Sequence, residues 1–384
     1  MDLSNHRIIR IDWARLEGER PRRAGCNARL GEHGQRVAPA LARLTTSDGA
    51  TGFGWAWLSE EDARNLVGFV LEDALTPTFR VKEPLRALEY PVLDLAARLA
   101  GRPVYRLLNP EAPPSLRVPC YDTSLYFDDL HLAETAAAAD LIAGEAAEGH
   151  GRGHRNFKIK VGRGAMHLPL TEGTARDVAI INAVRAAVGP DALLMIDANN
   201  GYNLNLTKEV LTATAGAGLY WIEEPFHEDA VLYRHLKRWL EDEDLAILVA
   251  DGEGDASPRL LPWVQDGLVD VLQYDCHNPG LTRWLELGST LALWAERDGC
   301  HAGAAPHNYG DPFGNYAVCH LAPALTTFEM AEWDEASVAG LDASGYAIRD
   351  GYVHIPNLPG FGLELDHDHY ARAIETNGFT VVAE

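Results

Sequence analysis

The feature that most constrains the fold is a repeat that runs from about residue 118 to about residue 331, in which short β-rich runs alternate with helix-compatible stretches. Such alternation is typical of βα units that build a parallel sheet. Segments such as 174–188 and 281–297 place apolar residues at helical spacing. The pattern predicts a closed α/β barrel of the TIM type. Its strands are expected at residues 118–126, 156–162, 193–199, 219–224, 245–253, 269–275, 301–307 and 326–330.

The two ends of the chain do not follow this repeat. The N-terminal part has alternating strands, a glycine-rich turn at 49–54 and a helix-rich stretch at 92–108, which indicates a separate α+β unit. Short strands and turns return after residue 345. We therefore expect residues 1–117 to form a capping domain and residues 118–340 to form the catalytic barrel. Residues 341–384 should pack back on the cap.

Charge and composition exclude several classes of partner. The formal net charge of −23 repels phosphate backbones and anionic lipids, so we expect no nucleic acid and no membrane partner. The N-terminus lacks an apolar signal region, and no run approaches the roughly 18 apolar residues of a membrane span, which favours a cytoplasmic location. The five cysteines are widely spaced without a Cys-x-x-Cys motif, which favours reduced thiols. The acidic excess does not exclude an anionic substrate, because a bound cation can reverse the field inside one pocket.

Three of the expected strands end in acidic residues, Asp197, Glu223 and Glu253. The carboxyl ends of the strands of a parallel barrel open on one mouth, so these side chains should converge there. Hard oxygen ligands that leave open positions favour Mg²⁺ over zinc. Asp251 shares a strand face with Glu253 and is an alternative ligand. In a second interpretation, each acid only caps the helix that follows it.

Two lysines, Lys158 and Lys160, lie on the same face of the strand expected at 156–162. Both ammonium groups should then point into the barrel. A lysine that is buried beside another cation and a metal loses stability in its charged form, so we expect a lowered pKa and a role as a base. The alternative is an edge strand with exposed lysines.

A further proton-transfer group is expected where the sixth and seventh runs end, in Asp275 and His307. A carboxylate on one imidazole nitrogen orients the ring and raises its basicity. His301 is a rival for the role of His307. These residues predict a carboxylate–histidine pair across the mouth from the lysines.

Taken together, the motifs resemble the enolase superfamily, and within it the mandelate racemase subgroup with its acid-sugar dehydratases. The segment 90–108 and the closing segment 359–363 resemble the same family outside the site. The motifs that carry the resemblance are Lys158-x-Lys160, Asp197-Ala198-Asn199, Ile222-Glu223-Glu224-Pro225, Gly252-Glu253, Asp275 and Pro306-His307-Asn308.

The resemblance implies a modified (β/α)7β TIM-type barrel with an α+β capping domain, and substrate bound between them. It also implies Mg²⁺ on the three strand-end acids, Lys160 as a base and Lys158 as its electrostatic neighbour. Asp275 and His307 would act as a dyad. Asn199 and Glu329, the latter at the expected end of the eighth strand, would contact the substrate.

The activity implied by the resemblance is Mg²⁺-dependent removal of the α-proton of a small carboxylate substrate. Dehydration of a sugar acid, an aldonate or an aldarate, to a 2-keto-3-deoxy acid is favoured. A racemase, epimerase or cycloisomerase could use the same residues, and a non-catalytic binding barrel is an alternative from another class. A zinc hydrolase is weakened by the lack of a histidine-rich strand end. The family also suggests a symmetric homo-oligomer.

Overall fold

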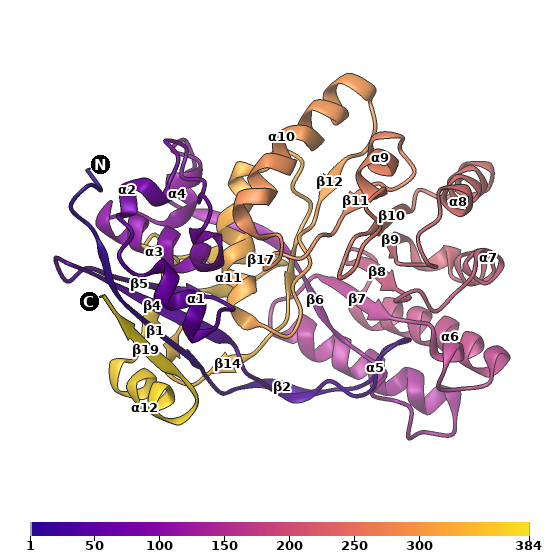
Figure 1. The fold of residues 1–384 in the computed structure, drawn as a ribbon. Helices are drawn as coiled ribbons and strands as arrows, with labels where there is room; N and C mark the ends of the chain where they lie inside the picture. Colours follow the sequence, from indigo (N-terminus) through magenta and orange to yellow (C-terminus); the bar gives the residue numbers. More distant parts are fainter. Residues whose placement is uncertain (1, 384) are drawn as a thin grey trace.

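The computed structural model describes residues 2–383, and a barrel of parallel strands is its largest unit (Figure 1). Neighbouring strands pair in chain order from β6 to β12, and β13 pairs with the free side of β6. A parallel bridge between Ala304 and Phe328 links β12 to the segment before β13, so the two edges of the sheet meet. The strands are β6 (Leu116–Leu125), β7 (Asn156–Lys160), β8 (Leu193–Asp197), β9 (Leu219–Glu223), β10 (Leu248–Asp251), β11 (Val271–Leu272), β12 (Gly303–Ala304) and β13 (Ala331–Trp333).

Within residues 2–383, an α-helix follows each of these strands except β13, which is the predicted (β/α)7β arrangement. Three of the helices begin at residues whose side chains accept hydrogen bonds from first-turn amides, namely Asn203, Asp229 and Asp311. Every helix in this part of the chain is too short or too polar to span a lipid bilayer. The barrel helices are α5 (Thr135–Gly151), α6 (Leu170–Val188), α7 (Leu204–Ala213), α8 (Ala230–Asp242), α9 (Leu260–Gln265), α10 (Gly280–Asp298) and α11 (Pro312–Leu321).

The eighth barrel strand differs from the prediction. It was expected at 326–330, but the chain pairs with β6 only at Ala331–Trp333. The 3-10 helix η4 (Ala322–Ala324) follows α11, and the amide of Phe328 donates to the carbonyl of Leu325, so the chain is still turning there. The strand therefore carries Glu332, and Glu329 precedes it.

The capping unit is built around an antiparallel sheet in the order β19-β1-β4-β5, in which β19 is Phe379–Val382. The helix α3 packs against β5, and Figure 1 shows this unit beside the barrel. A second small sheet in the order β14-β2-β3, in which β14 is Ser337–Val338, extends from the cap along the barrel. The elements are β1 (Ile8–Arg15), β2 (Gly18–Ala24), β3 (Gly34–Val37), β4 (Ala40–Thr46), β5 (Thr51–Trp55), α1 (Glu60–Leu66), α2 (Leu71–Ala74), η1 (Leu85–Leu88), α3 (Glu89–Leu99) and α4 (Val104–Leu108).

The C-terminal segment contacts both units. Strand β19 (Phe379–Val382) pairs with β1 of the cap, and α12 (His367–Asn377) packs on the same strand. Strand β17 (Tyr352–Ile355) instead pairs antiparallel with β6 of the barrel. The remaining short strands are β14 (Ser337–Val338), β15 (Leu341–Asp342), β16 (Ala347–Arg349) and β18 (Glu364–Leu365).

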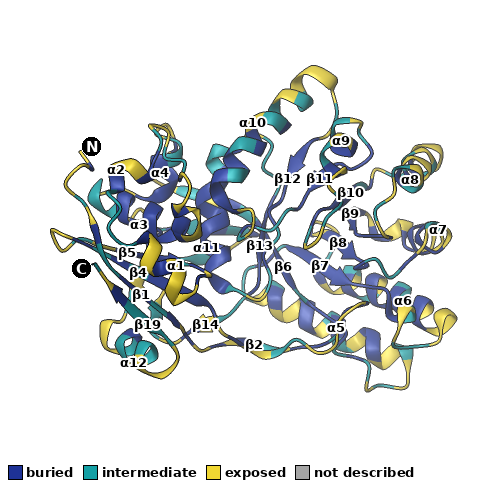
Figure 2. Ribbon diagram, viewed as in Figure 1, coloured by how far each residue is buried: buried dark blue, intermediate teal, exposed yellow. Residues whose placement is uncertain are grey.

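The barrel strands are buried on both faces, and the helices expose only their outer sides (Figure 2). This is the pattern expected when helices cover a parallel sheet. One apolar cluster packs among the strands and consists of Tyr121, Met195, Trp221, Ala250, Val271, Ala305 and Met330. The packed core gives the side chains at the strand ends a rigid base.

A fully buried ion-pair network holds the turn after β7. The guanidinium of Arg163 lies 2.7 Å from Asp129 and 2.8 Å from Asp177, and it also donates to the carbonyl of Lys160. Removing one partner of a buried network leaves uncompensated charge in a medium of low polarity. We expect Arg163→Met to lower the free energy of unfolding by about 3–5 kcal/mol, measured by urea denaturation.

The matched control is Arg297→Met, which removes an arginine that pairs with Asp298 on the surface. Exposed pairs contribute little to stability, so this variant should unfold like the unmodified protein. Equal effects of the two substitutions would contradict the structural role of the buried network.

Candidate active site

Strand register brings the candidate groups together at the barrel mouth. In the parallel pairing, Lys160 lies opposite Asp197, and Asp197 lies opposite Glu223. Glu253 follows β10 by two residues and joins them. Ligand atoms of the three carboxylates all lie within 4.8 Å of one another. The predicted convergence of Asp197, Glu223 and Glu253 is therefore present in the fold.

The turns after β8 and β9 hold these acids in place. Asn199, Asn200 and Glu224 have φ angles of +41°, +61° and +40°, a region that asparagine adopts more readily than glutamate does. The Asn199 side-chain amide lies 3.0 Å from a carboxylate oxygen of Glu224 and 3.0 Å from one of Glu253. The unusual backbone of Glu224 persists because Asn199 and Asn200 both donate hydrogen bonds to its carboxylate.

Glu223 is oriented by two neighbours inside the barrel. Gln273 donates to its Oε2 at 2.8 Å, and the indole N–H of Trp221 donates to the same oxygen at 3.2 Å. Burial, together with the negative charges of Asp197 and Glu253, raises the pKa of Glu223 to about 8, although Lys158 opposes the shift. Three converging carboxylates with fixed orientations, one of them with a raised pKa, fit Mg²⁺ as the ion they would hold.

Both predicted lysines are buried beneath this mouth. Nζ of Lys158 lies 2.7 Å from Glu223 Oε1 and 2.8 Å from Glu332 Oε1, and Lys160 pairs with Asp197. The alternative of an exposed edge strand is wrong, because β7 is central and each of its residues is buried.

The expected lowering of the lysine pKa is not found. Burial opposes the charged form of Lys160, but the negative charge of Asp197 outweighs it and raises the pKa of this lysine. The pKa of Lys158 is raised well above its usual value, because Glu223 and Glu332 outweigh its burial. The prediction counted the positive neighbours of each lysine and overlooked the carboxylates in direct contact.

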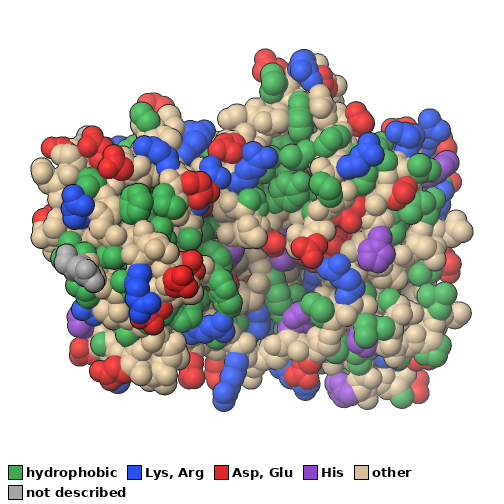
Figure 3. Space-filling model, in the orientation of Figure 1, with side chains coloured by type: hydrophobic (Ala, Val, Ile, Leu, Met, Phe, Trp, Pro, Cys, Tyr) green, Lys and Arg blue, Asp and Glu red, His purple; other side chains and the backbone are tan. Residues whose placement is uncertain are grey.

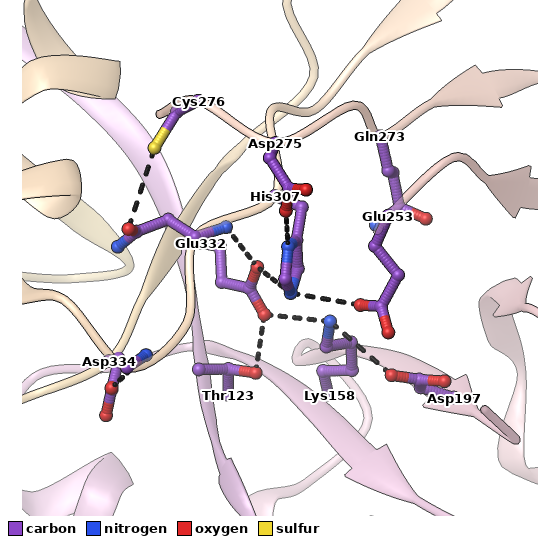
Figure 4. Close-up of polar contacts among 12 residues, drawn as sticks. Thr123, Lys158, Asp197, Glu253, Gln273, Asp275, Cys276, His307, Glu332 and Asp334 are labelled. Atoms are coloured by element: carbon purple, nitrogen blue, oxygen red, sulfur yellow. Dashed lines mark hydrogen bonds and ion pairs between the residues drawn. The ribbon is translucent and has the colours of Figure 1, made fainter. Parts of the chain in front are cut away.

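Asp275 and His307 meet across the mouth, where β11 and β12 end. Their backbones form a parallel bridge, and Nδ1 of His307 lies 2.5 Å from Asp275 Oδ1. The other ring nitrogen lies 3.0 Å from Glu253 Oε2 (Figure 4). The Asp275 contact thus fixes the ring so that Nε2 faces the acids.

His301 and Glu329 lie elsewhere. His301 precedes β12 and Glu329 precedes β13, so both lie toward the N-terminal ends of the strands. They bond to each other at 2.7 Å, and Tyr220, at the start of β9, donates to Glu329 at 2.6 Å. The expectation that Glu329 ends the eighth strand and contacts substrate is therefore wrong, and His301 is not placed to replace His307.

Asp251 and Glu253, the two candidate acids near the end of β10, differ in position. Asp251 is buried and accepts a hydrogen bond from the Tyr233 hydroxyl at 2.5 Å, so it is turned toward α8. Glu253 instead joins Asp197 and Glu223. The glutamate is the acid from this strand that could hold the ion.

One acid of the site was missed by the sequence reasoning. Glu332 on β13 is 1% exposed, accepts from the Thr123 hydroxyl at 2.7 Å and from the Asn308 amide at 2.8 Å, and contacts Lys158. Its oxygens lie between the lysine and His307 (Figure 4). The sequence signal that could have indicated Glu332 as a strand-end acid is the apolar pair Met330 and Ala331 directly before it.

Comparison with known proteins places this site in a family. A sequence model of the enolase C-terminal domain-like family matches residues 141–369. The chain belongs to this family. The family match and the strand order together confirm the expected fold class and the predicted resemblance.

Solved structures of the enolase superfamily are similar over nearly the whole chain. A variant of galacturonate dehydratase from Geobacillus sp., in complex with Mg, is 47% identical with a TM-score of 0.93, covering 98% of this chain and 97% of that one. The same enzyme in complex with D-galacturonate and 5-keto-4-deoxy-D-galacturonate is also 47% identical, with a TM-score of 0.92 and coverage of 98% and 99%.

Curated relatives are more distant. The D-gluconate/D-galactonate dehydratase of Picrophilus torridus is 26% identical over 376 residues, which is 88% of this chain and 90% of that enzyme. The D-galactarolactone cycloisomerase of Agrobacterium fabrum is 29% identical over 241 residues, and the match spans 59% of this chain and 58% of that enzyme.

Proposed function

We propose that the protein is a Mg²⁺-dependent sugar-acid dehydratase, with a hexuronate such as D-galacturonate as the first candidate substrate. The observation that carries the proposal is the gathering of Asp197, Glu223 and Glu253 at one mouth, opposite Lys160 and the Asp275–His307 pair. The similarity to galacturonate dehydratase at 47% identity supports the substrate class.

The product held by that related enzyme indicates which bonds change. In 5-keto-4-deoxy-D-galacturonate the carbonyl is next to the carboxylate, and the adjacent carbon has lost its oxygen. This outcome requires loss of the α-proton and the β-hydroxyl as water, followed by conversion of the resulting enol to the ketone. The same elimination on an aldonate gives a 2-keto-3-deoxy acid.

The residues at the mouth can perform both proton transfers. Removing a proton beside a carboxylate creates a dianion, which a site must stabilise far better than the substrate. Mg²⁺ held by the three strand-end acids would supply that positive charge, as in other enolase-superfamily sites. Lys160 would take the α-proton at Nζ as a neutral amine, once a bound ion offsets the charge of Asp197 that raises the pKa of this lysine. His307 would donate a proton from Nε2 to the leaving hydroxyl, while Asp275 holds Nδ1.

Lys158 and Glu332 would position these groups without exchanging protons with the substrate. The ammonium of Lys158 bridges Glu223 and Glu332 and orients both carboxylates. Against the effect of burial, its charge also lowers the pKa of Glu332. The side-chain amide of Asn199 would hold the carboxylates of Glu224 and Glu253 in place at the mouth. Such positioning roles fit the burial of Lys158 and Glu332 and their direct pairing.

Asp275→Asn should lower kcat by roughly 10²- to 10³-fold while KM changes little, because the amide leaves the imidazole in the wrong orientation or tautomer. Steady-state kinetics on D-galacturonate checks this. The control, Asp266→Asn, changes an exposed aspartate after α9 and should behave like the unmodified protein. A loss below threefold for Asp275→Asn would remove the dyad from the mechanism.

The proposal as a whole is tested with a panel of acids and Mg²⁺, using D-galacturonate, D-galactonate, D-gluconate and galactarate. We expect a keto acid from at least one of them. If no keto acid forms but solvent deuterium enters the α-carbon, a racemase or epimerase is favoured. If neither occurs with any acid, the non-catalytic binding protein is favoured.

A cycloisomerase remains the second candidate, since D-galactarolactone cycloisomerase is among the relatives. It would use the same α-proton chemistry, and product analysis with galactarolactone separates the two. A symmetric homo-oligomer, a cytoplasmic location and the absence of a nucleic-acid partner remain predictions.

A further inference from the structure

A single loop of the capping unit places a cation over the acids of the mouth. Nη2 of Arg29, from the loop between β2 and β3, lies 3.6 Å from Glu253 Oε1 and 3.7 Å from Glu224 Oε2. The Arg29 side chain is 43% exposed, whereas Lys158 and Lys160 are buried. Figure 3 shows the molecule hollowed between its two halves, with charged and histidine side chains around the hollow.

The loop that carries Arg29 is held firmly. Oδ1 of Asn27 accepts hydrogen bonds from the amides of Arg29 at 2.9 Å and Leu30 at 2.6 Å. The ring of His167, in the loop after β7, lies 2.8 Å from the carbonyl of Asn27. The backbone at Arg29 therefore has a fixed position over the barrel.

Close packing sets the height of this loop above the barrel. The buried methyl of Ala28 rests on Gly162 and Gly201, where an added Cβ would lie only 2.8 Å and 2.6 Å from it. Larger residues at the two glycines would lift the loop. The sequence after β7 and β8 thus leaves room for the cap loop to approach the acids.

The Arg29 guanidinium remains available to a ligand. Its separations from Glu253 and Glu224 exceed a normal N–H···O hydrogen bond of about 2.7–3.2 Å, so the pairing is ionic and its donors are not committed to these oxygens. A guanidinium presents a planar fork of donors that suits carboxylate and hydroxyl oxygens.

We propose that Arg29 is a substrate-binding residue that attracts the anionic sugar acid into the mouth and holds its oxygens there. The inference rests on the proposed function for the nature of the anion. An overall charge of −23 and the cluster of acids repel such a substrate, and an exposed cation at the entrance offsets this repulsion locally. The positive charge of Arg29 also opposes the binding of a divalent cation to Glu253, because the guanidinium competes for that carboxylate.

The Arg29→Met variant tests this assignment. Calorimetric titration gives two dissociation constants, one for Mg²⁺ alone and one for tartrate at saturating Mg²⁺. Tartrate is suitable because a related Geobacillus protein was obtained in complex with magnesium/tartrate. Mg²⁺ should bind roughly three- to tenfold more tightly, because a nearby positive charge is gone. Tartrate should bind about tenfold more weakly, because a charged hydrogen-bond donor is lost.

The matched control is Arg23→Met, since Arg23 is exposed near the same loop and pairs with Glu32. It should leave both constants within twofold. If Arg29→Met weakens Mg²⁺ and tartrate together, Arg29 only supports the fold of the site, and the inference is wrong. Unchanged constants, or no tartrate binding by the unmodified protein, would also overturn it.

The test of Arg29 can fail or succeed independently of the test of the proposed dehydratase activity. The two dissociation constants could shift in opposite directions in a protein that makes no keto acid from any sugar acid. Arg29 would then be an anion-binding residue, and the proposed dehydratase activity would be wrong. Keto-acid formation with an unaltered KM for D-galacturonate in Arg29→Met would keep the dehydratase and reject the role of Arg29.

Discussion

Lys160→Met should lower kcat for sugar-acid dehydration by at least about 10³-fold, because methionine preserves the buried length of the side chain and removes the base. KM should change little, since the substrate carboxylate would still meet the metal. The measurement is keto-acid formation from D-galacturonate at saturating Mg²⁺. Exchange of the α-proton with solvent deuterium should fall in parallel.

The control for this substitution is Lys208→Met on the outer helix α7, where the ammonium lies over the ring of Trp239. That variant should retain full turnover. If Lys160→Met keeps more than a tenth of the activity while circular dichroism shows an intact fold, another group removes the proton and the assignment of the base is wrong.

Removal of Mg²⁺ should abolish turnover, with a loss beyond about 10⁴-fold, since a dianion without a cation is inaccessible at this site. Dialysis against a chelator and re-addition of Mg²⁺ gives the measurement. Binding of the ion should also raise the melting temperature, because it joins carboxylates that otherwise repel one another. Full activity in the chelated protein would exclude the metal from the reaction.

Two variants distinguish the loss of a metal ligand from the loss of a buried carboxylate that does not bind the ion. Glu223→Gln should weaken Mg²⁺ binding by at least roughly tenfold, because it removes a charged ligand. Asp251→Asn is the control on the neighbouring strand, where burial already raises the pKa of the carboxyl well above its usual value. An amide at that position can still accept from Tyr233, so Mg²⁺ affinity should be retained.

The barrel could be predicted because two local signals agree along the chain. The strand runs end in acids and the following segments have helical spacing, so both the fold class and the meeting of Asp197, Glu223 and Glu253 follow from parallel register. The pairing of Asp275 with His307 followed from neighbouring strand ends in the same way.

Other features depend on contacts that a local pattern does not contain. The turn after η4 delays the eighth strand, so Glu332 takes the place expected for Glu329. The lysine pKa values depend on which carboxylates touch each ammonium, and that is decided across strands. The pairing of β17 with β6 joins segments more than two hundred residues apart, which no short-range signal reveals.

The most direct measurement follows the reaction of D-galacturonate in D₂O by proton NMR, with Mg²⁺ present and with the ion removed. We expect 5-keto-4-deoxy-D-galacturonate only when Mg²⁺ is present, with solvent deuterium on the carbon that has lost its hydroxyl. Keto acid at the same rate in the chelated protein would contradict the claim that an ion held by residues 197, 223 and 253 makes the α-proton removable.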